Sequence, residues 1–216
     1  MKTLNIVESK RLMEKYGIKF ADSRLAKSTE EAMILANSIG YPVALKVVSD
    51  DISHKTDVGG VSVGIRGDSE LERAFKDMTM SVKKKYPKAK LRGVMVQKMV
   101  EDGLNILIGG KRDPQFGQVV VFGLGGIFVE VMEDVAMRVV PVGRKEAMDM
   151  MAETKAFKVI DGYRGKSYDA EALAQIIVKV SSMLEKRGDI VEMDINPVIA
   201  LKKGAVAVDA RIVLDG

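Results

Sequence analysis

The sequence of 216 residues predicts an α+β fold. Segments with helical spacing of apolar residues and short, nearly continuous apolar segments do not alternate regularly along the chain. Helices open the sequence, and strands then occur in runs, which disfavours a doubly wound parallel sheet. With 47% hydrophobic and 30% charged residues, the composition is that of a globular protein that can bury a core.

The first part of the chain is predicted to hold three helices and three strands. Ser28 or Thr29 can cap the second helix, and Asp68 or Ser69 the third, because these side chains accept hydrogen bonds from exposed N–H groups. The helices are expected at residues 5–18, 28–40 and 68–86. The strands are expected at residues 41–48, 59–65 and 91–100.

The second part is predicted to end in a hairpin of two strands joined by the turn "KKG". Strands or extended segments are expected at residues 104–113, 118–126, 129–142, 190–201 and 204–214. Helices are expected at 144–163 and 169–189. A lobe boundary near residues 91–100 divides the chain into an expected N-terminal lobe, 1–95, and a C-terminal lobe, 96–216.

Composition excludes several classes of protein. The chain has no cysteine, which rules out disulfides and thiolate metal sites, and no apolar run long enough to span a bilayer. Charges interrupt the N-terminus, so a cytoplasmic protein is expected. The basic run Lys83–Arg92 lacks interleaved aromatic residues, which argues against nucleic acid, whereas a net charge of +4 suits polyphosphates.

Three elements of the sequence suggest a phosphate site. Lys46 interrupts an apolar strand, where a lysine either reaches solvent at the edge or meets an anion. Gly59 and Gly60 begin the next strand, where they form either a simple turn or a place for a phosphate to approach backbone N–H groups. A second glycine-rich turn, "FGLGGI", follows the strand at 118–126.

A further group, of oxygen-bearing side chains, lies near the C-terminus. Glu192, Asp194 and Asn196 alternate along one strand and therefore share a face, and Asp209 on the next strand can face the same side. Such donors suit Mg²⁺, which completes its shell with water and substrate phosphates. A polar outer face of an antiparallel sheet is the alternative explanation.

From about Gly17 to Leu214 the chain resembles the ATP-grasp superfamily and, within it, the β subunits of ADP-forming acetyl-CoA synthetases, which are related to succinyl-CoA synthetase. The resemblance lies in "YPVALKVVSDDISHKTDVGGV", "DPQFGQVVVFGLGGIFVEVMEDVAMRVVP" and "EMDINPV…VAVDARI". It implies two α+β lobes that clamp ATP or ADP with Mg²⁺. It also implies the reversible reaction acyl-CoA + ADP + phosphate ⇌ carboxylic acid + CoA + ATP. A larger α subunit, in an α₂β₂ heteromer, would carry the CoA site and the first phosphohistidine.

The resemblance also implies roles for individual residues. Lys46, Gly59 and Gly60 would contact nucleotide phosphates, and Asn196 and Asp209 would hold Mg²⁺ with Asp194 close by. The hinge along the adenine would comprise Gln97, Lys98, Met99 and Val100. Many relatives carry glutamate after this hinge, where this chain has Asn105, so that position departs from the family pattern.

His54 is the only histidine of the chain. Taken alone, it would be a surface or capping residue, but "HKTDVGG" fits the family pattern "HK-x-D-x-GG", whose histidine is thought to relay a phosphoryl group towards ADP. Neutral imidazole is a nucleophile at cellular pH. Asp57 would either orient the ring or lie on the metal side.

Three other functions are alternatives to this one. Another ATP-grasp ligase, such as a succinyl-CoA synthetase β chain or a carboxylate–amine ligase, fits less well because of "HKTDVGG". A non-catalytic nucleotide- or CoA-sensing module is disfavoured by the presence of Lys46, Asn196 and Asp209. A nucleic-acid binder is the third alternative, and it predicts salt-sensitive retention on DNA.

Overall fold

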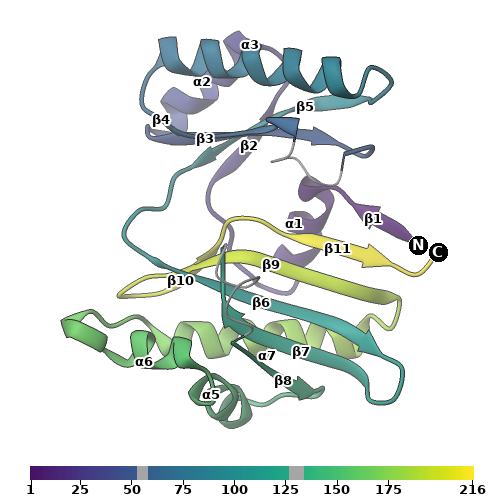
Figure 1. The fold of residues 1–216 in the computed structure, drawn as a ribbon, viewed down its shortest axis with the longest axis vertical. Coiled ribbons are helices and arrows are strands. Elements are labelled where there is room, and N and C mark those ends of the chain that lie inside the picture. Colours follow the sequence, from purple (N-terminus) through teal and green to yellow (C-terminus); the bar gives the residue numbers. More distant parts are fainter. Residues whose placement is uncertain (53–57, 127–133) are drawn as a thin grey trace. The chain divides into compact units, whose positions relative to one another are not determined.

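The computed structural model describes residues 1–52, 58–126 and 134–216 (Figure 1). These residues form two compact units: a larger unit of residues 1–20 and 102–216, and a smaller unit of residues 21–101. The predicted division after residue 95 differs from this one, because residues 1–20 belong with the C-terminal part. The reason is strand pairing, since β1 (Lys2–Leu4) lies antiparallel to β11 (Arg211–Leu214).

The smaller unit is a four-stranded antiparallel sheet in the order β2-β5-β3-β4, with two helices on one side (Figure 1). Its strands are β2 (Ser23–Ala26), β3 (Val43–Ser49), β4 (Val61–Ile65) and β5 (Leu91–Lys98). Its helices are α2 (Thr29–Ile39) and α3 (Asp68–Lys85). Of these elements, only β2 was not predicted, because four residues are too few to show a strand period.

The two faces of β3 have different partners. Val43, Leu45 and Val47 pack into the core with residues of α2 and α3. The alternate residues, which include Lys46, therefore lie on the opposite face of the sheet. All seven residues of β3 are buried, as predicted for this segment.

One helix cap in the smaller unit was predicted correctly and one was not. The hydroxyl of Ser28 accepts a hydrogen bond from the Glu31 N–H and caps α2. The N-cap of α3 is Gly67, and neither Asp68 nor Ser69 takes this position. The Asp68 carboxylate instead accepts hydrogen bonds from the Tyr41 hydroxyl and the Asn37 amide.

The larger unit contains an antiparallel sheet in the order β1-β11-β9-β6-β7-β8, with β10 also paired to β9. Its further strands are β6 (Leu104–Asp113), β7 (Gly117–Leu124), β8 (Val135–Val139), β9 (Ile190–Ala200) and β10 (Ala205–Ala207). Its helices are α1 (Ile6–Glu14), α5 (Arg144–Ala152), α6 (Lys155–Asp161), the short 3₁₀ helix η2 (Tyr163–Gly165) and α7 (Ala170–Lys186).

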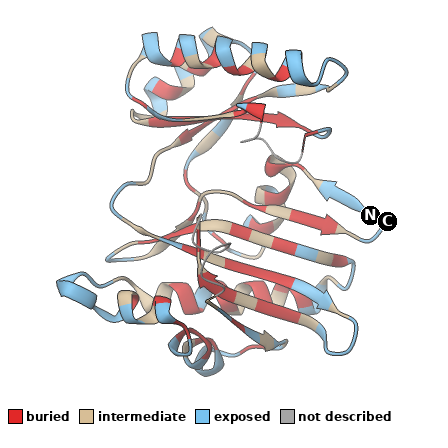
Figure 2. Cartoon of the chain, in the orientation of Figure 1, coloured by how far each residue is buried: buried red, intermediate tan, exposed pale blue. Residues whose placement is uncertain are grey.

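The core of the larger unit lies between this sheet and α7. Buried residues occur along both α7 and the strands of the sheet (Figure 2). Ile108 and Phe122 of the sheet are fully buried, as are Leu173, Ile177 and Leu184 of α7, and all five belong to one apolar cluster. Helical spacing of the α7 residues places them on one face, as the sequence predicts. In the part of the chain that the structure describes, no helix combines the length and apolar character needed to cross a membrane.

The single helix predicted at 144–163 was wrong, because the chain breaks between α5 and α6. The Thr154 hydroxyl donates to the Met151 carbonyl oxygen at 2.8 Å at this break. The Asp134 carboxylate accepts hydrogen bonds from the N–H groups of Lys155 and Ala156 and thereby starts α6. A carboxylate distant in sequence supplies these acceptors, so local spacing could not show the break.

The strand predicted at 204–214 is two strands, β10 and β11. Both strands pair with β9. β10 lies opposite residues 198–200, and β11 lies opposite residues 190–194. The Ala207 N–H donates to the Lys19 carbonyl oxygen, so the chain pairs briefly with the segment after α1 before β11 begins. Asp209 lies in the connection between the two strands.

Asp169 caps α7, and its removal should destabilise the larger unit. Its carboxylate accepts hydrogen bonds from the N–H groups of Gly204 at 2.7 Å and Ala172 at 2.9 Å, and these bonds lower its pKa from the ordinary 3.8. We expect Asp169→Ala to reduce the free energy of unfolding by about 1–2 kcal/mol at neutral pH.

The pH dependence of this effect has a definite sign. The pKa of Asp169 is lower in the folded state than in the unfolded state. Its contribution to the free energy of unfolding is therefore fully present above the unfolded-state pKa and is lost as pH falls through the folded-state pKa. Urea unfolding of the wild-type chain and Asp169→Ala should therefore differ less at about pH 3 than at neutral pH. An equal difference at both pH values would contradict this assignment.

Candidate nucleotide and metal site

Lys46 and Gln97 lie on the same face of the smaller sheet. Lys46 pairs with Met95 of β5, and Gln97 pairs with Ala44 of β3, so both side chains project from the face opposite α2 and α3. Lys46 is 5% exposed and Gln97 is 1% exposed. The alternative in which Lys46 reaches bulk solvent at a strand edge is therefore excluded. A lysine buried this deeply needs polar or anionic groups around its ammonium, as a phosphate site would supply.

Gly59 and Gly60 lie beside the strand that carries Lys46. The Gly60 carbonyl oxygen accepts a hydrogen bond from the Val47 N–H at 2.8 Å, which extends the β3–β4 pairing. Gly59 has a φ of +67°, and a Cβ atom there would lie 3.2 Å from the Ser81 hydroxyl of α3. The structure therefore brings the lysine and both glycines of the predicted phosphate site together within the smaller unit.

The predicted hinge from residue 97 to residue 100 uses several of its donors inside the smaller unit. The Lys98 N–H donates to the Asp22 carbonyl oxygen and the Met99 N–H to the Pro42 carbonyl oxygen. The Lys98 ammonium donates to the carbonyl oxygens of Gly40 and Tyr41, at the C-terminal end of α2. A hydrogen bond from this stretch to a purine base would thus come from its other main-chain groups, such as those of Val100.

Asp194, Asn196 and Asp209 come together in the larger unit. The Asn196 N–H donates to the Asp209 carbonyl oxygen at 3.2 Å. Asp194 lies opposite Arg211 in the pairing of β9 with β11, and Arg211 also forms an ion pair with Glu192 at 3.1 Å. The pairing of β9 with β11 and the connection before β11 therefore bring Asp209 close to the β9 residues Asp194 and Asn196.

The carboxyl group of Asp194 has an unusual environment. Burial raises its pKa to about 6, the Arg211 guanidinium opposes this rise, and the negative charges of Asp209 and Glu192 add to it. Burial and like charges both disfavour the ionised carboxylate. A cation held between Asp194 and Asp209 would relieve both effects.

The side chains present suit magnesium as a partial shell. Among residues 1–52, 58–126 and 134–216, no three acidic or imidazole side chains converge closely enough to hold a metal ion by themselves. Asp194, Asp209 and the Asn196 amide offer oxygen donors only, which are the ligands that Mg²⁺ prefers. Because Mg²⁺ takes its remaining ligands from water and substrate phosphates, an incomplete protein shell fits this ion.

The glycine-rich turn "FGLGGI" contacts the group formed by Asp194, Asn196 and Asp209. The sequence did not predict this contact. The Asn196 side-chain oxygen accepts a hydrogen bond from the Gly126 N–H at 2.9 Å. The Gly125 N–H donates to the Asn105 carbonyl oxygen, and a Cβ atom on Gly125 would lie 2.7 Å from the Ile106 backbone. Asn105, the position that departs from the family pattern, thus adjoins the turn. Arg211 was also not predicted as a residue of this site. Its position two residues after Asp209 indicated that both side chains lie on the same face of the predicted final strand.

His54 and Asp57 lie outside the described residues. Their roles rest on the sequence motif, and the described residues that flank them are Ile52 and Val58. Both flanking side chains are buried in the core of the smaller unit, at 6% and 4% exposure. The described residues on either side of His54 and Asp57 therefore belong to the unit that carries Lys46.

A model of the ATP-grasp domain matches residues 1–214. The chain therefore belongs to the ATP-grasp family, and the predicted fold is confirmed. The ADP-forming acetate–CoA ligase I β subunit of Pyrococcus furiosus is 43% identical over 96% of this chain and 90% of its own length. The ADP-forming acetate–CoA ligase I of Archaeoglobus fulgidus is 45% identical over 94% of this chain, which spans 30% of that longer relative.

Solved structures agree with these sequence relatives. Acetyl-coenzyme A synthetase 1 of Ca. Korarchaeum cryptofilum, in complex with coenzyme A and Ca-AMPCP, has a TM-score of 0.95 and 43% identity over 99% of this chain and 94% of its own. The same protein with Mg-AMPPCP, whose phosphohistidine segment points towards the nucleotide site, has a TM-score of 0.86 and 40% identity over 99% and 93%. Within the ATP-grasp family, the chain is thus a β-subunit-type member of the ADP-forming acetate–CoA ligases, and the predicted enzyme class is confirmed.

Proposed function

We propose that the chain is the nucleotide-binding β subunit of an ADP-forming acyl-CoA ligase, with acetyl-CoA as the expected acyl-CoA. The buried Lys46 beside Gly60, on the face shared with Gln97, is the observation that carries this proposal. Charge-assisted hydrogen bonds from a buried ammonium suit phosphate oxygens better than any neutral ligand. The relatives named above support the same activity.

His54 is proposed to receive a phosphoryl group from a phosphohistidine of the α-type partner and to pass it to ADP. In the second step the N–P bond of phospho-His54 breaks while a terminal oxygen of ADP forms the new P–O bond, which gives ATP and free imidazole. The N–H groups of Gly59 and Gly60 and the Lys46 ammonium would stabilise the charge on the moving group. The described positions of these three residues support their shared role.

Asp194, Asn196 and Asp209 are proposed to hold Mg²⁺. Bound there with the nucleotide, the ion would neutralise charge on the diphosphate. The hydrogen bond from the Gly126 N–H would orient the Asn196 amide, and Arg211 would hold Glu192 away from the ion. A structural relative solved with Mg-AMPPCP supports the choice of cation.

The chain is proposed to act with a larger α-type subunit in an α₂β₂ heteromer. The relatives named β subunits support a separate partner, and the longer relatives, of which this chain spans 30%, support the same parts within one polypeptide. The proposed relay needs two histidines and this chain has one, so the first phosphohistidine is proposed to belong to the partner. ATP and ADP as substrates fit the cytoplasmic location expected from the sequence.

Calorimetric titration of the chain with ADP tests the nucleotide and metal assignments together. We expect binding that strengthens when Mg²⁺ is added, and Asp209→Asn should weaken Mg-ADP binding by about tenfold or more because it removes a charged ligand. Asp161→Asn, an exposed carboxylate at the end of α6, is the matched control and should bind as the wild type does. Equal Mg-ADP affinity in wild type and Asp209→Asn would rule out the proposed metal site.

A further inference from the structure

The smaller unit has a groove that the proposed nucleotide site does not use. It lies between α3, the turn that follows it and β5, and it encloses about 710 Å³. Phe75 and Val94 form part of its lining and are buried at 9% and 2% exposure, so they also belong to the core. Ala89 and Leu91 add partly buried apolar surface. We call this feature the α3–β5 groove.

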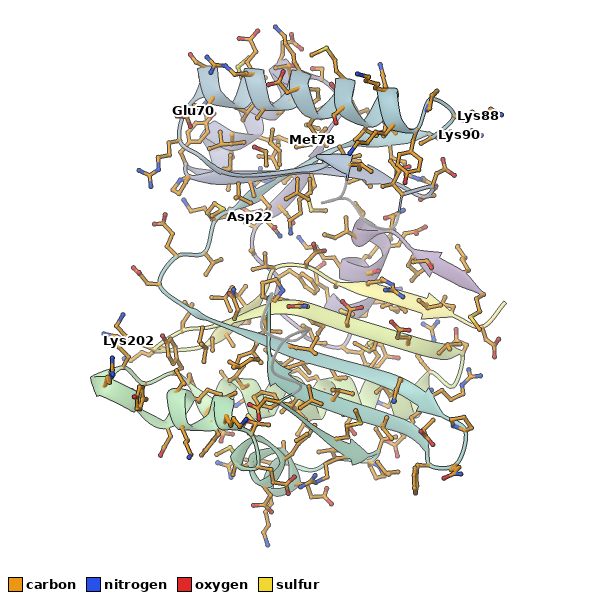
Figure 3. All side chains as sticks on the ribbon, in the orientation of Figure 1. Asp22, Glu70, Met78, Lys88, Lys90 and Lys202 are labelled. Carbon is orange, nitrogen blue, oxygen red and sulfur yellow. The ribbon has the colours of Figure 1, made fainter. Side chains whose placement is uncertain are left out.

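The rim of the α3–β5 groove is positively charged. Lys27, Lys83 and Arg92 line it, and among the described residues that line it there is no carboxylate. Arg92 forms an ion pair with Asp50, which offsets part of its charge, while Lys27 and Lys83 are exposed. The neighbouring turn adds Lys88 and Lys90, which project from it (Figure 3). The basic run seen in the sequence therefore surrounds an apolar groove.

This combination favours an acidic polypeptide over a free phosphate. The helix end at the groove is the C-terminal end of α3, whose carbonyl groups carry partial negative charge. Lys83, Lys84 and Lys85 in the last turn stabilise that end, but an isolated phosphate would still meet carbonyl oxygens there. A peptide can keep its carboxylates at the lysine rim and bury apolar side chains on the floor.

Nucleic acid fits the groove less well than a peptide. Bases bind single-strand sites largely by stacking on aromatic faces. Phe75 is the one aromatic residue among the described groove residues, and at 9% exposure its ring belongs to the core. The apolar floor formed by Ala89, Leu91 and Val94 would contribute little to a sugar–phosphate backbone.

We propose that the α3–β5 groove binds an acidic segment of the α-type partner that carries apolar side chains. This inference rests on the proposed function, because that function requires a partner chain. Charge complementarity with the basic rim would speed and orient association, and burial of apolar side chains on the floor would slow dissociation. The groove lies in the smaller unit, so docking would anchor the partner to the unit that holds Lys46.

The test measures binding between the purified chain and its purified α-type partner by calorimetry at low and high salt. We expect the double variant Lys27→Glu/Lys83→Glu to raise the dissociation constant by about tenfold or more and to remove most of its salt dependence. Ala89→Arg should also weaken binding, although it adds positive charge, because it fills the apolar floor. Thermal melts confirm that each variant is folded.

A matched control is Lys202→Glu/Lys203→Glu, which reverses two exposed lysines in the turn between β9 and β10. Lys202 is labelled in Figure 3. This control should bind the partner as the wild type does. All variants should bind Mg-ADP normally, and a wild-type chain that fails to bind Mg-ADP would count against the proposed function rather than against the groove.

Three results would overturn the docking proposal. The first is unchanged partner affinity in both groove variants. The second is salt-sensitive retention of the wild-type chain on single-stranded DNA that only the groove variants lose, since this would assign the groove to nucleic acid. The third is self-association of the chain in analytical ultracentrifugation that the groove variants abolish, since a second copy would then occupy the groove.

Discussion

Replacement of His54 by Asn is expected to reduce ATP synthesis by the complex with the α-type partner by about 1,000-fold or more. Asparagine is of similar size but cannot accept a phosphoryl group. The dissociation constant for Mg-ADP should stay within about twofold, because the imidazole is proposed to act on the transferring phosphoryl group and not to hold the nucleotide. Coupled ATP assays and calorimetry on the same preparations measure the two effects.

The control for His54→Asn is Thr56→Ala, in the same motif at a position where the family pattern accepts any residue. It should retain turnover close to that of the wild type. If His54→Asn also retained it, the histidine would be a surface or capping residue after all. Loss of turnover in both variants together with weaker Mg-ADP binding would point to the shape of the segment rather than to the imidazole. Asp57→Asn can then show whether this carboxylate affects turnover or Mg²⁺ dependence.

Replacement of Lys46 by Met is expected to weaken Mg-ADP binding by about 10- to 100-fold. Methionine keeps most of the length of the side chain and removes the ammonium of Lys46, a residue that is 5% exposed on the face shared with Gln97. At this buried position the change should cost a bound anion more affinity than it would at an exposed site. The reason is that water cannot replace the lost ammonium charge there. Calorimetric titration with Mg-ADP measures the loss, and a thermal melt reports on folding.

Lys76→Met is the matched control for Lys46→Met. Lys76 is an exposed residue of α3 that pairs with Glu72 at 2.6 Å. It should leave Mg-ADP affinity unchanged and alter stability little, as expected for a surface ion pair that solvent screens. Should Lys46→Met fold and bind Mg-ADP as tightly as Lys76→Met does, Lys46 would be a structural lysine and the phosphate site would lie elsewhere.

Most elements of the fold could be predicted because their information is local. The buried strand β3, the amphipathic helix α7 and the Ser28 cap of α2 each depend on residues within a few positions of one another. The two main errors of prediction concern features that depend on residues far apart in the sequence. The break before α6 depends on Asp134, about 20 residues earlier, and the docking of residues 1–20 on the larger unit depends on β11 at the far end of the chain.

The candidate site shows the same division between local and distant information. Alternation along β9 was enough to place Asp194 and Asn196 on one face, and the connection between β10 and β11 brings Asp209 beside them. Periodicity could not show that Gly126 donates to Asn196, because 70 residues separate them. Periodicity also could not show that the Lys98 ammonium donates a hydrogen bond to a carbonyl oxygen at the end of α2. The neighbouring Gln97 lies on the same face of the sheet as Lys46.

The most direct test of the phosphoryl relay is to incubate the complex with ATP labelled with ³²P on the terminal phosphate and to separate the two chains. The chain has one histidine, so acid-labile, base-stable label on it can be assigned to His54. We predict such label on both chains, its loss from this chain on addition of unlabelled ADP, and its absence from this chain in His54→Asn. Label confined to the α-type partner while ATP synthesis proceeds at full rate would contradict the relay through this chain.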